Sequence, residues 1–203
     1  MSMIPYANDF DRALPDDLSS LTVLTICSNA LKIACSLLND GENAELASLR
    51  NLHSLTELQL LMFGMKTDNL ADIFFFLKKC QCANLERLFV QLSDRSDAPL
   101  EDLHEELGVQ PLENGLRNLR MAKVMNFNWR RFEVQLVTLL LRKASSLHKL
   151  LLVSPNVTPQ HVPGVPDADL LLLKEALACG LIILSECDDA ATQPFHSEVF
   201  IQV

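Results

Sequence analysis

The chain has 203 residues, of which 49% are hydrophobic and 21% are charged, and its formal net charge at pH 7 is −9. The apolar fraction is too high for a disordered chain, and the length suits one domain or one short repeat array. The acidic balance and the scattered basic residues argue against a nucleic-acid surface, so we expect no nucleic-acid partner.

The N-terminal residues 1–17 form a polar lead-in. They contain no basic segment followed by an apolar core, so we expect no secretory signal. The longest apolar run, residues 176–184, is too short to span a bilayer, so we expect no membrane partner. These features predict a cytoplasmic or nuclear protein whose six cysteines are reduced.

A short phrase with the pattern Leu-x-x-apolar-x-aliphatic returns six times along the chain. Its copies begin at residues 21, 55, 85, 119, 147 and 178, the last one degenerate with Ala178 in place of leucine, so they recur every 28 to 34 residues. Recurrence in this range is typical of a solenoid, in which each unit buries its apolar face only against its neighbours.

Each copy of the phrase predicts a strand, and helical patterns lie between most of the strands. The expected strands are residues 21–27, 55–63, 85–92, 119–127, 147–154 and 181–185, and the expected helices are 29–38, 70–79, 132–143 and 167–178. Residues 93–112 indicate an acidic loop that interrupts the array, and the residues after 185 indicate a polar tail. The alternation predicts an α/β fold, a leucine-rich-repeat-like solenoid of parallel strands alternating with helices.

Side chains alternate between the two faces of a strand, so the leucines of the phrase point inward and the residues between them form an outward-facing row. We expect six residues of this row to contact a protein partner, with Phe89 as an aromatic anchor: Glu57, Gln59, Arg87, Phe89, Met121 and Lys123. Apolar members of such a row remain in water unless something covers them. Two explanations stay open, because either a partner or a flanking part of the same chain, such as the acidic loop, could cover the row.

The sequence contains none of the common catalytic or phosphate-binding motifs. It has no Gly-x-Ser-x-Gly elbow, no glycine-rich phosphate loop and no Rossmann fingerprint. His104 is followed by two glutamates, as in zinc proteases, but Gly108 occupies the position of the second histidine. We therefore expect no catalytic residue, no metal and no cofactor, which means a protein that is not an enzyme.

Residues 115–152 resemble the FBD module of plant F-box/leucine-rich-repeat proteins. The family pattern is a strand ending in Phe, a short turn, a Glu, an apolar helix and Leu-x-x-Leu, and it matches Phe127, Glu133, Leu136, Leu140, Ala144, Leu147 and Leu150. Residues 80–90 and 183–189 are also similar to grass members of the family. The resemblance divides the chain into a leucine-rich-repeat region, 18–112, and an FBD-like region, 113–203, that completes the same array.

The resemblance implies the substrate-recognition part of an F-box ubiquitin-ligase receptor, which presents a protein substrate and performs no chemistry. In the family an N-terminal F-box binds the Skp adaptor of a cullin-type ligase, and the lead-in 1–17 is too short to hold one. A Skp adaptor is therefore an expected partner only if an F-box is supplied elsewhere. The alternative is a stand-alone leucine-rich-repeat scaffold or competitor without a ubiquitin-ligase link.

Overall fold

A computed structural model describes residues 17–39, 49–80, 82–93, 116–155, 163–188 and 192–197. The elements in chain order are β1 (Val23–Cys27), α2 (Ser28–Asn39), β2 (Glu57–Met62), α3 (Thr67–Lys79), β3 (Arg87–Leu92), β4 (Met121–Met125), α4 (Arg131–Lys143), β5 (Lys149–Val153), α5 (Asp167–Ala178) and β6 (Ile182–Ser185). Every strand and helix expected from the sequence is present, with ends shifted by a few residues at most. The lead-in, apart from Asp17, and the acidic loop, apart from Ser93, lie outside the described residues.

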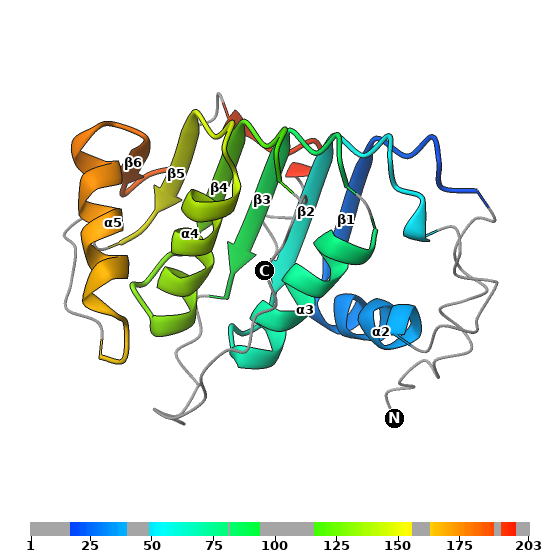
Figure 1. The fold of residues 1–203 in the computed structure, drawn as a ribbon, viewed down its shortest axis with the longest axis horizontal. Helices are drawn as coiled ribbons and strands as arrows, with labels where there is room; N and C mark the ends of the chain where they lie inside the picture. Colours follow the sequence, from blue (N-terminus) through cyan, green and yellow to red (C-terminus); the bar gives the residue numbers. More distant parts are fainter. Residues whose placement is uncertain are drawn as a thin grey trace.

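The six strands form one parallel sheet in which the spatial order β1-β2-β3-β4-β5-β6 follows the chain. All four of these helices lie on the same side of the sheet (Figure 1). The α/β architecture with parallel strands and alternating helices is therefore confirmed. β3 pairs with β4, so one sheet continues across the boundary that the sequence predicts between residues 112 and 113.

A turn of the same kind precedes each of the first five strands. In every copy the N–H of the first leucine donates to the carbonyl three residues earlier, at 3.0–3.2 Å: Leu21 to Leu18, Leu55 to Leu52, Leu85 to Cys82, Leu119 to Leu116 and Leu147 to Ala144. These turns explain why the strands begin two residues later than the sequence predicts, since the first leucine of each phrase belongs to the turn.

Neighbouring copies are joined by a repeated hydrogen-bond arrangement. The carbonyl of Thr56 accepts the N–H groups of Glu86 and Arg87, at 2.9 and 3.0 Å. The same paired acceptance from the next copy recurs at the carbonyls of Thr22, Glu86 and Arg120. Two asparagine side chains add to the ladder, because Asn84 donates to the His53 carbonyl at 2.6 Å and Asn118 to the Ala83 carbonyl at 2.7 Å.

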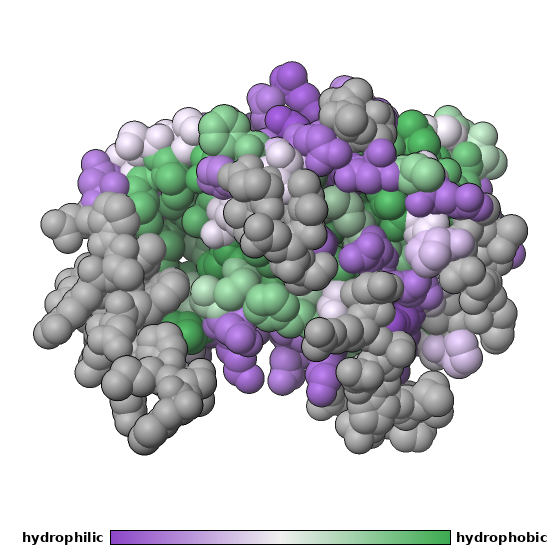
Figure 2. Space-filling view, turned by 180° about the vertical axis from the view of Figure 1, so that it is seen from behind, coloured by the Kyte–Doolittle hydropathy of each residue, from purple (hydrophilic) through white to green (hydrophobic). Residues whose placement is uncertain are grey.

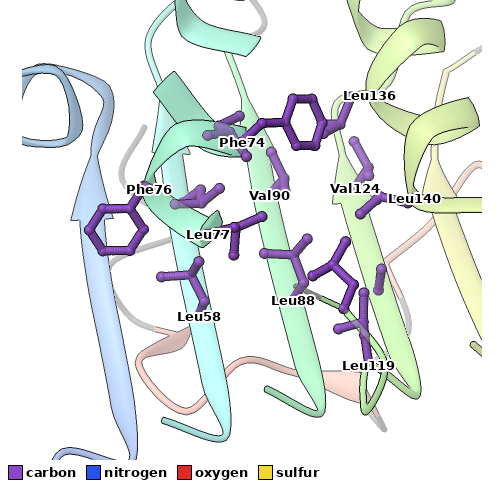
Figure 3. Packing of buried hydrophobic residues seen from close by; sticks show 14 of the residues in the cluster. Leu58, Phe74, Phe76, Leu77, Leu88, Val90, Leu119, Val124, Leu136 and Leu140 are labelled. Atoms are coloured by element: carbon purple, nitrogen blue, oxygen red, sulfur yellow. The ribbon is translucent and has the colours of Figure 1, made fainter. Parts of the chain in front are cut away.

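The main hydrophobic core lies between the sheet and the helices. Leu58 and Leu88 point from the strands toward Leu77 of α3, and Val124 points toward Leu140 of α4 (Figure 3). All five side chains are buried, as the inward leucine positions of the phrase predict. Burying a leucine or valine side chain contributes about 1.5–3 kcal/mol, so this layer holds the helices on the sheet.

The turn between β4 and α4 is organised by the buried side chain of Glu133. Its Oε2 accepts the backbone N–H groups of Asn128 at 2.7 Å and Arg130 at 3.2 Å. Trp129, between these two donors, has a positive φ of 59°, and its buried ring packs edge-on against Phe127 with 5.0 Å between centroids. A left-handed tryptophan is strained, so these contacts are needed to hold the turn.

Candidate functional site: the strand face

The sheet face opposite the helices, here called the strand face, brings the six candidate residues into two adjacent rows. The first row holds Glu57, Arg87 and Met121, and the second holds Gln59, Phe89 and Lys123. In each strand one residue between the rows points to the helices. Viewed from this side, the molecule presents a mixture of hydrophilic and hydrophobic surface (Figure 2).

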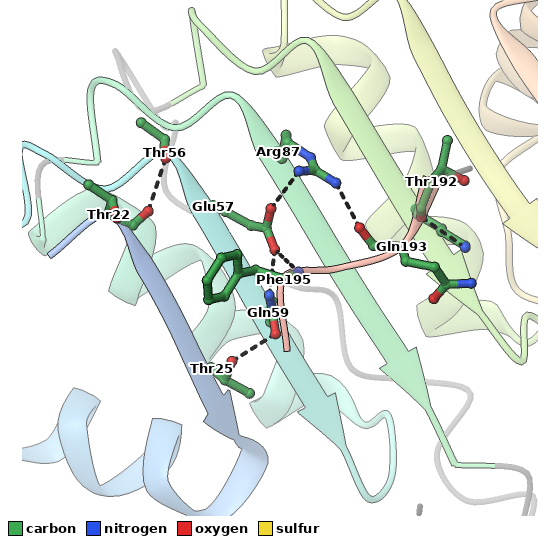
Figure 4. A network of polar contacts seen from close by, with 10 residues as sticks. Thr22, Thr25, Thr56, Glu57, Gln59, Arg87, Thr192, Gln193 and Phe195 are labelled. Atoms are coloured by element: carbon green, nitrogen blue, oxygen red, sulfur yellow. Dashed lines mark hydrogen bonds and ion pairs between the residues drawn. The ribbon is translucent and has the colours of Figure 1, made fainter. Parts of the chain in front are cut away.

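A C-terminal segment, residues 192–197, crosses the strand face and is here called the tail segment (Figure 4). Lys123 on β4 donates to the Thr192 carbonyl at 3.1 Å, and Arg87 on β3 donates to the Gln193 carbonyl at 2.8 Å. The N–H of Phe195 donates to Glu57 Oε1 on β2 at 2.7 Å. His196 Nδ1 lies 2.8 Å from the Thr25 hydroxyl on β1. The tail segment therefore contacts four successive strands in turn.

A directed chain of hydrogen bonds runs beneath the tail segment. The Glu57 carboxylate accepts the amide N–H of Gln59, which turns the Gln59 carbonyl oxygen toward Thr25. The Thr25 hydroxyl donates to this oxygen at 2.8 Å. Because that donation uses the only hydroxyl proton, Nδ1 of His196 must donate to Thr25.

Charged groups on the strand face are paired with opposite charges. Arg87 Nη1 lies 2.9 Å from Glu57 Oε2, and the Arg87 guanidinium carbon also lies 4.9 Å from the centroid of the Phe89 ring. The buried Lys123 ammonium forms an ion pair with Asp188, which follows β6. The pairs bring two positive and two negative charges together, so this part of the strand face is nearly neutral.

A second hydrophobic cluster, separate from the main core, lies on the strand face. Leu61, Phe89 and Met125 are its buried members. Cys27, Met121 and Val153 pack against them and stay partly exposed. Phe89 therefore supports the sheet from the side opposite the helices.

Four of the six candidate side chains are covered, so the second of the two open explanations, cover by a flanking part of the chain, holds for them. Glu57 is 3% exposed, and Gln59, Phe89 and Lys123 are 0% exposed. The physical reason is cover from within the chain, because the tail segment and the neighbouring strand side chains lie over them. Arg87 and Met121 remain partly exposed. A contact between these residues and a protein partner stays a prediction.

Sequence reasoning missed the tail segment and Asp188, which it assigned to a polar tail. A signal was nevertheless present in the strands, where the polar residues Glu57, Gln59 and Lys123 lie within β2 and β4. Polar side chains at covered strand positions require hydrogen-bond partners. Nothing in the pattern of the strands indicates that the partners come from the C-terminus.

The arrangement is suited to holding a polypeptide backbone. Two cations hold carbonyl oxygens and one carboxylate holds an N–H, while the side chain of Phe195 is 70% exposed. Recognition of main-chain groups gives affinity with little dependence on the side chains of the bound segment.

Three buried cysteine thiols lie on the helix side, away from the strand face. Burial, with a contribution from the Asp72 charge, raises the pKa of Cys35 to about 12. Burial also raises the pKa of Cys82 to about 12 and raises that of Cys80. A thiol with so high a pKa is neither a nucleophile nor a ready metal ligand at neutral pH.

Comparisons with known proteins give no relative, since no protein-family model, no curated protein and no solved structure matches the chain. Within the described ranges, no group of three or more His, Cys, Asp or Glu side chains is placed to hold a metal ion. None of the four described helices combines the length and the apolar character needed to cross a bilayer.

Proposed function

We propose that the chain is a protein–protein interaction module, and that it serves as the substrate-recognition part of an F-box ubiquitin-ligase receptor. The observation that carries the proposal is the strand face, which already holds a polypeptide segment through groups supplied by four neighbouring strands. A surface that binds its own chain in this way has the chemistry to bind another protein.

The architecture we propose is a leucine-rich-repeat-like solenoid. Three repeated features support it: the turn before each of the first five strands, the shared carbonyl that joins neighbouring copies, and the sequential parallel strand order. The asparagine ladder at Asn84 and Asn118 also repeats in register. In such arrays each unit packs on its neighbours only, and the strands build a continuous binding surface.

The link to a ubiquitin ligase rests on the FBD resemblance. Glu133 and Leu140, two of the matching residues, are buried where they hold α4 on the sheet, which fits a structural module. We propose that a Skp adaptor joins the chain only through an F-box supplied elsewhere. The strand face would then hold the substrate.

Of the six candidate contact residues, we assign the first contact with a partner to Arg87 and Met121, since both are partly exposed with the tail segment in place. Glu57, Gln59, Phe89 and Lys123 would meet a partner only if the tail segment moved.

The proposal is tested with a matched pair of charge introductions. Met121→Glu places a carboxylate on the strand face, and Leu171→Glu places one on α5, where Leu171 is 57% exposed on the opposite side of the molecule. Tagged chains carrying either change are compared with the parent chain for the proteins that they retain from plant cell extract. We expect some proteins to be retained by both the parent chain and Leu171→Glu but not by Met121→Glu. Equal retention by all three chains would contradict a role for the strand face.

The ligase link needs a second experiment. The chain is joined to an F-box segment and assembled with a Skp adaptor, a cullin and the ubiquitin-charging enzymes. We expect ubiquitin transfer to the proteins whose retention depends on Met121, and no transfer with Met121→Glu. Retention without ubiquitin transfer would instead support the stand-alone scaffold or competitor.

A further inference from the structure

The tail segment is short for the four strands that it contacts. Four parallel strands span three inter-strand spacings of about 4.8 Å, or about 14 Å in total. The contacts run from Thr192 to His196, and four residues reach about 14 Å only when fully extended. Phe195 and His196 form a turn, so the side chains of Lys123, Arg87 and Glu57 bridge part of the distance between the strands and the segment.

Most contacts of the tail segment use its main chain. The carbonyls of Thr192 and Gln193 and the N–H of Phe195 are held by Lys123, Arg87 and Glu57. Two side-chain features add to these contacts: the hydrogen bond between His196 and Thr25, and the buried ring of Pro194. Because any peptide offers the same main-chain groups, the site accepts sequences other than that of the tail segment.

The tail segment covers the polar groups beneath it. Glu57 and Lys123 are buried with the tail segment in place, and their hydrogen bonds to it would pass to water if it left. A second peptide that supplies the same carbonyls and N–H restores the direct hydrogen bonds, so it can occupy the place of the tail segment.

Resting on the proposed function, we infer that the strand face is a peptide-binding site and that the tail segment is its occupant in the free chain. The protein partner offers an uncharged segment that replaces the tail segment. The segment is uncharged because Glu57 is paired with Arg87 and Lys123 with Asp188, which leaves no charge for the peptide to neutralise. It carries proline or another compact residue at the position of Pro194 and a hydrogen-bond donor for Thr25.

The inference is tested by cutting the chain after it has folded. A recognition sequence for a specific protease replaces residues 189–191, the protein is purified, cut and dialysed, and a labelled peptide of residues 192–203 is added. We expect the cut chain to bind the peptide, measured by fluorescence anisotropy, and the uncut control to bind it at least 100-fold more weakly. The difference follows from the tether, which gives the tail segment an effective concentration in the millimolar range. Absence of binding to a cut chain that keeps its circular dichroism spectrum would overturn the inference.

Two altered peptides separate main-chain recognition from nonspecific hydrophobic binding. A methyl group on the amide nitrogen of Phe195 removes the donor to Glu57, and we expect at least tenfold weaker binding. Phe195→Ala keeps that donor and removes a side chain that is mostly exposed, so we expect a change of less than threefold. Equal affinities for these two peptides, or a larger loss with Phe195→Ala, would contradict main-chain recognition.

Hydrogen exchange on the uncut parent chain keeps the inference testable if the cut chain unfolds. A displaceable tail segment opens without global unfolding, so we expect the Phe195 amide to exchange at least tenfold faster than the Leu88 amide in the central strand β3. Equal exchange of both amides would show that the tail segment is a fixed part of the fold.

The outcomes are distinguishable from those of the proposed function. If Met121→Glu abolishes retention of a partner while the cut chain binds no peptide, the proposed interaction module is supported and the peptide-binding site is contradicted. If the peptide binds and also displaces the retained partner from the cut chain, both proposals are supported. If the peptide binds and no retained protein depends on Met121, the strand face holds only its own tail segment, and the inferred partner segment is contradicted.

Discussion

The side chain of Lys123 on β4 is wholly buried, and the carboxylate of Asp188, which follows β6, is its ion-pair partner. Asp188 also accepts a hydrogen bond from the Gln193 side chain at 3.1 Å, so it connects the sheet with the tail segment. The two members of the pair differ in exposure, because the Asp188 side chain is 39% exposed. Removing one member is therefore not equivalent to removing the other.

We expect Asp188→Ala to lower the free energy of unfolding by about 2–3 kcal/mol, since it leaves a buried ammonium without its counter-charge. The loss is below that of a fully buried pair because Asp188 is partly exposed to solvent. Lys123→Met keeps the volume and removes the charge, so we expect a change of no more than about 1 kcal/mol. Urea unfolding followed by circular dichroism measures both. A Lys123→Met loss as large as that of Asp188→Ala would mean that the ion pair itself stabilises the fold.

Strand and helix positions could be predicted because the repeat phrase fixes them. Leu58, Leu88 and Leu150 stand at the same place in three copies, and all three are buried on the helix side. What the phrase does not contain is the turn before each strand. In that turn Cys82 and Ala144 accept the same hydrogen bond as the leucines of other copies, so backbone geometry is conserved between copies where residue type is not.

The sequence could predict which candidate residues share a face of the sheet. It could not predict that the tail segment covers them. Alternation along a strand determines which residues lie side by side, as for Gln59, Phe89 and Lys123. The tail segment covers these residues through contacts of Glu57 and Lys123 with residues more than 60 positions later in the chain. No local sequence pattern encodes such distant contacts. The polar character of these strand residues was the only local indication.

Two phenylalanines, one covered and one exposed, test which side chains of the strand face contribute to stability. Phe89 is 0% exposed and belongs to the cluster with Leu61 and Met125, so we expect Phe89→Ala to lower the free energy of unfolding by about 3–5 kcal/mol. Phe195 is 70% exposed, and we expect Phe195→Ala to change it by less than about 0.5 kcal/mol. Denaturant unfolding of the two variants gives the comparison. A small effect of Phe89→Ala would mean that this side chain is open to solvent and available to a partner.

Cysteine labelling tests the burial on the helix side. The pKa of Cys35 and of Cys82 is raised to about 12, so at pH 8 these thiols hold almost no thiolate, whereas Cys179 and Cys187 are exposed. We expect iodoacetamide to modify Cys179 and Cys187 in the native protein, and to modify Cys35 and Cys82 only in denaturant. Mass spectrometry of peptides from native and denatured samples measures each site. Native labelling of Cys82 at the rate of Cys179 would show that the helix layer opens readily.

Glu133 gives the fold a pH dependence of known sign. Burial raises the pKa of its carboxyl, while hydrogen bonds from Asn128 and Arg130 and the Arg130 charge oppose the rise. The folded protein then holds its proton to higher pH than the unfolded chain, for which the reference pKa is 4.5. Stability contributed by the protonated form is present below pH 4.5 and is lost as pH rises through the folded-state pKa.

We therefore expect the free energy of unfolding of the parent chain, minus that of Glu133→Gln, to fall as pH rises from about 4.5 and then to reach a plateau. Glu175→Gln, at an exposed position on α5, serves as the control for replacing a glutamate by glutamine. Urea unfolding at a series of pH values measures both differences. A difference that rises with pH for Glu133→Gln would mean that the two backbone donors and Arg130 stabilise the carboxylate by more than burial destabilises it, so that the charged form is the one that holds the turn before α4.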